Sequence, residues 1–100
     1  MNKYTGDLST LAEHPDVKDF GCDTDDNWII FQIHGYVVEA KVFEHPREYG
    51  ICKGRISKMQ IRRGLSIVYN YDRGEDLNPT GKTALKILKL VIKLVDGKDT

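Results

Sequence analysis

Four short segments in the middle of the chain alternate between apolar and polar residues, which is the pattern of half-buried β-strands. They are rich in β-branched and aromatic side chains and span residues 28–33, 36–43, 55–61 and 65–72. His34-Gly35 separates the first pair and Arg62-Arg63-Gly64 the second, and the glycines favour tight turns. Residues 44–54 contain a proline and two glycines, which indicate a loop between the pairs. The pattern predicts a four-stranded antiparallel meander.

A helical period follows these strands. Asn78-Pro79 supplies an N-cap and a first helical position, and Gly97 is of the type that ends helices, so the pattern predicts a helix over residues 79–96. Four lysines fall within a narrow stripe of this helix, at positions 82, 86, 89 and 93, and apolar residues fill most of the remaining circumference. One helix across one face of the meander gives an α+β fold.

The apolar arc of this helix is wider than one face of a sheet requires. Either the helix lies deep against a curved sheet, with the N-terminal residues over its flank, or the chain forms a homodimer through its C-terminal helix. In the strands, strict alternation predicts that Leu65 and Ile67 face the helix and that Ile56 faces away. The predicted core consists of Ile29, Phe31, Ile33, Val38, Ala40, Val42, Met59, Ile61, Leu65, Ile67, Leu85, Leu88, Val91, Ile92 and Val95.

The first 27 residues differ from the rest of the chain. They are polar and acidic and show only a weak helical pattern, around Leu8 to Ala12. We expect residues 1–27 to form an acidic, partly flexible N-terminal arm, residues 28–97 a single α+β domain, and residues 98–100 a tail. One hundred residues are enough for one hydrophobic core but not for two.

The composition adds a charge asymmetry to this picture. With a formal net charge of zero, 40% apolar and 30% charged residues, the chain has the composition of a soluble globular protein. However, residues 1–50 hold four basic against ten acidic residues, and residues 51–100 hold eleven against five. The basic half either lies against the acidic half or presents a patch to an anionic partner.

Signals for membranes and export are weak throughout the sequence. No apolar segment approaches the roughly 20 residues that cross a bilayer, and the first residues lack the basic and apolar regions of a secretory signal. We therefore expect a cytoplasmic protein with no membrane partner, in which Cys22 and Cys52 are free thiols.

Motifs for nucleotides and metals are incomplete. Gly81-Lys82-Thr83 opens the helix as the end of a phosphate-binding loop does, but Asp76 stands where that motif needs its first glycine. The acidic run before Trp28 lacks the glycine and the glutamate of a calcium loop, and the cysteines and histidines lack the short paired spacings of zinc sites. We expect no cofactor and no metal.

Two segments have single features of catalytic sites. Cys52 lies between two glycines and beside Lys53, which favours a thiolate, and His45 is the nearest base in the sequence. Asp72 lacks a second carboxylate or a histidine at a spacing that would commit it to catalysis. We interpret Cys52 as a small buried or half-buried thiol and Asp72-Arg73-Gly74 as a structural turn in which Gly74 can take a positive φ angle. The protein is therefore predicted not to be an enzyme.

The basic second half supplies the candidate surface for a partner. Basic residues interleaved with aromatic ones contact phosphates and bases together in nucleic-acid-binding proteins. The candidate residues, for a protein or a nucleic acid, are Lys53, Arg55, Lys58, Arg62, Arg63, Tyr71, Asp72 and Arg73. Alternation weakens the nucleic-acid interpretation, because it sends Arg55 and Lys58 to opposite sides of their strand.

Several short motifs give the chain a resemblance to a known group of sequences. They are Ala40-Lys41-Val42-Phe43, Tyr49-Gly50-Ile51, Gly54-Arg55-Ile56-Ser57-Lys58, Ile61, Asn70-Tyr71-Asp72-Arg73-Gly74 and Pro79. In these the chain resembles small uncharacterised proteins encoded by phages and prophages of Gram-positive bacteria. Those proteins often carry a tryptophan where Glu75 stands here, and they often begin near the first strand. The resemblance implies a sheet-plus-helix domain of phage or prophage origin and carries over no catalytic residue.

The incomplete motifs, the apolar excess of the helix and the split charge together favour an interaction module over an enzyme. We predict a non-enzymatic module that binds a host or phage protein. The alternative is a nucleic-acid-binding protein that uses the basic second half.

Overall fold

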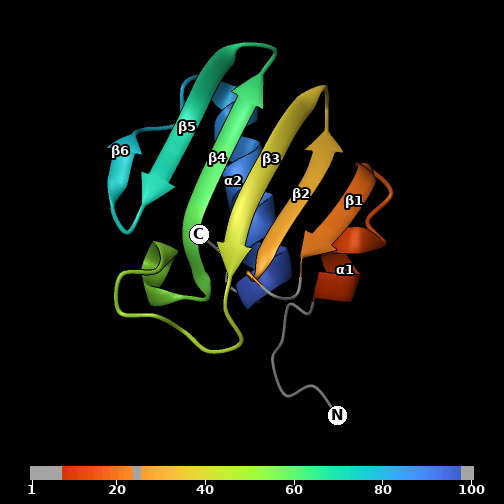
Figure 1. Cartoon of the computed structure of the whole chain (residues 1–100). Coiled ribbons are helices and arrows are strands. Elements are labelled where there is room, and N and C mark those ends of the chain that lie inside the picture. Colours follow the sequence, from red (N-terminus) through yellow and green to blue (C-terminus); the bar gives the residue numbers. More distant parts are fainter. Residues whose placement is uncertain (1–7, 24–25, 98–100) are drawn as a thin grey trace.

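The computed structural model describes residues 8–23 and 26–97, and within them six strands form one antiparallel sheet in the order β1-β2-β3-β4-β5-β6. The strands are β1 (Val17–Asp23), β2 (Trp28–Ile33), β3 (Tyr36–Val42), β4 (Ile56–Arg63), β5 (Ser66–Asp72) and β6 (Glu75–Leu77). The helices are α1 (Leu8–Ala12), the short 3-10 helix η1 (Ile51–Lys53) and α2 (Lys82–Asp96). α2 lies across one face of the sheet and leaves the other face uncovered (Figure 1). The predicted α+β class, an antiparallel sheet with a C-terminal helix, is confirmed.

The prediction of four strands is wrong, because the sheet also contains β1 and β6. β1 comes from residues expected to form the N-terminal arm, and it pairs with β2. Its pattern is hard to recognise because the register shifts between Lys18 and Gly21, where Asp19 has a left-handed φ of 55°. Within the expected arm and tail, residues 1–7, 24–25 and 98–100 lie outside the described residues.

α2 begins later than predicted, at Lys82 rather than Pro79. Thr80 donates its N–H to the carbonyl oxygen of Val68 at 2.8 Å, which holds the preceding residues beside β5, and Gly81 turns the chain into the helix with a φ of 91°. The predicted end is confirmed, because Gly97 has a left-handed φ of 68°. Within residues 8–23 and 26–97, no helix combines the length and the apolar character that crossing a membrane requires.

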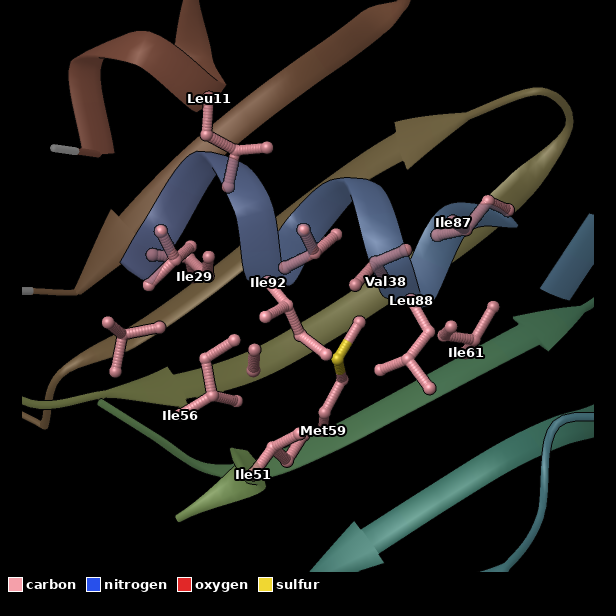
Figure 2. Close-up of a cluster of buried hydrophobic side chains, with 14 of the residues drawn as sticks. Leu11, Ile29, Val38, Ile51, Ile56, Met59, Ile61, Ile87, Leu88 and Ile92 are labelled. Atoms are coloured by element: carbon pink, nitrogen blue, oxygen red, sulfur yellow. The ribbon is translucent and has the colours of Figure 1, made fainter. Parts of the chain in front are cut away.

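The core lies between α2 and the covered face of the sheet (Figure 2). The buried helix positions are 84, 87, 88, 91, 92 and 95, whereas the lysine stripe is exposed. Leu11 of α1 is completely buried in the same cluster and reaches the flank of α2, and Ile51 of η1 lies at the other side. α1 and the sheet together therefore account for most of the wide apolar arc of α2 without a second copy of the chain.

Two β-bulges change which residues of the last two long strands face this core. In β4, Ser57 is an extra residue opposite Lys41 and Val42, so Ile56 pairs with Val42 and is buried, although alternation predicts that it faces away. In β5, Val68 is the extra residue, so Ile67 pairs with Arg62 on the uncovered face. A bulge shifts the register by one residue, and every side chain beyond it changes face.

For three residues, the prediction that they belong to the core is wrong. Ile67 is 46% exposed because of the bulge, Leu65 is fully exposed in the turn between β4 and β5, and Leu85 is 41% exposed beside the lysine stripe of α2. Other buried residues are absent from the predicted core, namely Leu11, Ile51, Ile56, Tyr69, Ala84 and Ile87.

Candidate functional site

Figure 1 is viewed from the uncovered side of the sheet, which we call the outer face. Strand pairing arranges its side chains in three rows across the strands: Asp23, Trp28, Lys41, Lys58 and Asp72; Ile30, Glu39, Gln60, Asn70 and Leu77; and Lys18, Gln32, Val37, Arg62 and Ile67. Apolar, amide and charged residues are mixed in these rows. The outer face therefore differs from the strictly polar exposed face of many antiparallel sheets.

Several charges of the outer face are paired with one another. Arg62 contacts the carboxylate of Glu39 and donates to the side-chain oxygen of Gln60 at 3.3 Å. Lys58 Nζ and Arg73 Nε lie 3.7 Å and 3.9 Å from the same oxygen, Asp72 Oδ1. All of these ion-paired side chains are at least 31% exposed, so each ion pair contributes little to stability.

A hollow of about 640 Å³ opens at the end of the outer face where β4 begins and β5 ends. It is lined by Lys41, Phe43, Pro46, Arg47, Glu48, Tyr49, Ser57, Lys58 and Arg73. Of the described residues in this lining, four are cationic and one, Glu48, is acidic. We call it the basic hollow.

The loop between β3 and β4 forms one wall of the basic hollow. The guanidinium carbon of Arg47 lies 4.3 Å from the centre of the Phe43 ring, and the Lys41 ammonium lies 5.6 Å from it, so one ring holds two cations. Arg47 also donates its N–H to the carbonyl of Gly54 at 2.9 Å, and the Tyr71 hydroxyl donates to the carbonyl of Tyr49 at 2.7 Å. These bonds tie the loop to η1 and β5 while the Tyr49 side chain stays exposed.

The opposite wall is built where the β4 bulge meets the turn after β5. Arg73 has a left-handed φ of 57° and donates its N–H to the carbonyl of Ser57 at 3.0 Å. Gly74 lacks a positive φ, contrary to the prediction, so the arginine and not the glycine takes the strained conformation of this turn. This conformation brings the cationic side chain of Arg73 to the hollow.

Ser57 is buried in this wall, and its hydroxyl has no hydrogen-bond partner among the described residues. A buried hydroxyl without a partner loses its hydration and gains nothing in return. We therefore expect Ser57→Ala to keep the free energy of unfolding or to raise it by about 1 kcal/mol. Urea unfolding measures this, with the exposed Ser66→Ala as control, and a loss of stability specific to Ser57→Ala would contradict the expectation.

Arg55 does not belong to the exposed surface that the sequence predicts. It is 7% exposed, and its guanidinium donates to the carbonyl of Phe43 at 2.8 Å and to that of Val95 at 3.0 Å. Its backbone N–H donates to Asp96 Oδ1 at 3.0 Å. The β4 bulge turns this part of the strand inward, so Arg55 links the start of β4 to the end of α2 and is not available to a partner.

The other predicted surface residues are divided between two ends of the sheet. Lys58, Tyr71, Asp72 and Arg73 meet at the basic hollow or beside it. Arg62 and Arg63 lie at the opposite end of β4, where Arg63 is 5.7 Å from the centre of the Tyr36 ring. Lys53 is exposed on η1, and so is Cys52, so the expectation of a buried or half-buried thiol is wrong.

Sequence reasoning missed Lys41, Phe43, Arg47, Tyr49 and Ser57 as residues of a site. A partial signal was present, because all of them except Arg47 fall in motifs that carry the family resemblance. The converging cations of the hollow are suited to hold an oxyanion. No group of three or more histidine, cysteine, aspartate or glutamate side chains converges to hold a metal within the described part of the chain.

A family model matches more than half of the chain. The model of a family described as a domain of unknown function, DUF7678, matches residues 27–96. These residues run from the start of β2 to the end of α2, so they include all residues of the basic hollow and leave out α1 and β1. No curated protein and no solved structure matches the chain.

Proposed function

Because the chain belongs to DUF7678, a family of domains of unknown function, we propose its function from its own surface: it is a non-enzymatic module that binds a partner protein through the outer face of its sheet. The proposal includes a phage or prophage origin and a cytoplasmic location. The origin is supported by the motif resemblance between Ala40 and Pro79.

The observation that carries this proposal is the apolar character of the outer face. Ile30 is 43% exposed and Ile67 is 46% exposed, and Leu65 extends from the adjacent turn into solvent. They lie near amide residues and mutually paired charges, which is the mixed composition of non-obligate protein interfaces. A partner protein would bury these side chains while the paired charges form the polar rim.

Nucleic-acid binding is the alternative function, and the basic hollow is the observation that favours it. Four cations beside the exposed ring of Tyr49 resemble the sites where single strands stack on aromatic residues. Against it, Arg55 is buried and Arg62 lies at the other end of the sheet, so the basic residues do not form a continuous track for a phosphate backbone.

The proposal is tested by affinity capture from a bacterial lysate, with and without nuclease. We expect a protein partner to be captured both with and without nuclease. The Ile30→Glu variant should fail to capture it, and the Leu85→Glu variant should still capture it. Ile30 and Leu85 are a matched pair, because their side chains are similarly exposed, at 43% and 41%, but lie on different surfaces. Ile30 lies on the outer face and Leu85 on α2. Loss of the partner with nuclease would favour nucleic acid, and loss with Leu85→Glu alone would move the interface to α2.

A further inference from the structure

The basic hollow has positive charge that its own carboxylates do not neutralise. Lys58 and Arg73 share one partner, Asp72, across 3.7 Å and 3.9 Å. Lys41 and Arg47 instead contact the ring of Phe43, and no ion pair joins either of them to a carboxylate among the described residues. A ring satisfies a cation only weakly in water, so both remain available to an anion.

A second hollow of about 290 Å³ continues the basic hollow across the outer face. The two share Lys58, and the second is lined also by Trp28, Glu39, Gln60 and Asn70 together with Met59, Tyr71 and Asp72. A tryptophan wall next to amide side chains suits an apolar or amide side chain rather than an anion. The second hollow also has two carboxylates, Glu39 and Asp72, so the two hollows together present a cationic end and an end that disfavours anions to one bound segment.

We propose that the basic hollow binds the carboxylates of an acidic segment of the partner protein, with the next side chains of that segment in the second hollow. This rests on the proposed function and names the chemistry of its partner. Lys41 and Arg47 on one wall and Lys58 and Arg73 on the other hold the carboxylates from two sides. The exposed apolar residues toward the other end of the outer face bind the rest of the segment.

Charge complementarity favours an acidic peptide over a nucleic acid. The carboxylate of Glu48 lines the basic hollow, and those of Glu39 and Asp72 line the second, so a chain with a phosphate at every nucleotide would meet repulsion as it crossed the outer face. A peptide places its carboxylates only where cations stand. Within the described lining of the basic hollow, the ring of Phe43 is already covered by cations, which leaves the exposed ring of Tyr49 for base stacking.

The test measures binding of fluorescein-labelled peptides in which a pair of glutamates is followed only by serine and leucine, by anisotropy, at about 0.05 M salt, where exposed charges are weakly screened. The matched peptide carries glutamine in place of glutamate, and a labelled oligothymidylate of similar length is the nucleic-acid probe. We expect the glutamate peptide to bind more tightly than both. Arg47→Glu and Arg73→Glu are each expected to weaken its binding about tenfold, because each removes an attraction and adds a repulsion.

Arg63→Glu is the matched control, since it makes the same charge change on an exposed side chain at the opposite end of β4. We expect it to change the affinity less than about twofold. Melting temperatures of all three variants verify that they fold. Absence of glutamate-peptide binding, equal weakening by Arg63→Glu, or tighter binding of oligothymidylate that Arg47→Glu abolishes would each overturn the inference. If, in the affinity capture, the Arg47→Glu variant still binds the partner protein and the Ile30→Glu variant does not, the inference of an acidic segment fails while the proposed function stands.

Discussion

Arg55→Ala is expected to lower the free energy of unfolding by about 3 kcal/mol. The guanidinium is buried and supplies hydrogen bonds to the carbonyls of Phe43 and Val95, so alanine removes a charged donor from both. The change also removes a positive charge from the C-terminal end of α2, where the helix dipole favours one. A domain of this size is stable by only about 5 to 15 kcal/mol, so the loss is a large part of the total.

Urea unfolding followed through Trp28, the single tryptophan of the chain, measures this loss. Lys53→Ala is the control, because it removes a neighbouring positive charge that is exposed, and we expect it to change stability by less than about 0.5 kcal/mol. Arg55→Lys should restore only part of the loss, since an ammonium group lacks the planar fork of donors. Equal unfolding midpoints for Arg55→Ala and Lys53→Ala would show that Arg55 does not join β4 to α2.

The part of the fold that the sequence predicts well is the part where side chains alternate without interruption. β2 and β3 pair residue by residue from Trp28 opposite Lys41 to Ile33 opposite Tyr36, and their predicted bounds differ from the observed ones by at most one residue. Their core residues are also predicted correctly. Alternation alone sets both the strand and its buried face there.

The errors begin where a strand contains an extra residue. The residue types around Ser57 and Val68 do not indicate a bulge, because a bulge depends on how the neighbouring strand pairs. Each bulge then reversed the predicted face of a residue, Ile56 in β4 and Ile67 in β5. β1 was missed for a related reason, since its register also shifts and its polar and apolar residues do not alternate.

The candidate site was harder to predict than the fold. Because they are close in the sequence, Arg55, Arg62 and Arg63 were grouped with Lys58 and Arg73. In the fold, Arg55 is buried, and Arg62 and Arg63 lie at the far end of the sheet. The residues that replace them come from β3 and the loop after it. Their meeting depends on the left-handed conformation of Arg73 and on the bond from Tyr71 to the loop, which are properties of the folded chain.

Gly50→Ala is expected to lower the free energy of unfolding by about 3 kcal/mol. A Cβ atom at this position would lie 2.2 Å from the carbonyl oxygen of Gly54 and 3.2 Å from that of Ile56. Both are backbone atoms, so the loop must open to make room. Gly50 has an ordinary φ of −72°, so the requirement for glycine here comes from space and not from conformation.

Gly74→Ala is the control for this change. Nothing lies within 4 Å of a Cβ atom at Gly74, and its φ is not positive, so alanine should keep the stability or raise it by up to about 1 kcal/mol. Urea unfolding compares the two variants. Because the loop that Gly50 closes also carries Arg47 and Tyr49, Gly50→Ala should in addition weaken the glutamate peptide under conditions where the variant is folded. Equal stability of the two alanine variants would contradict the close packing of Gly50 on Gly54 that shapes this wall of the basic hollow.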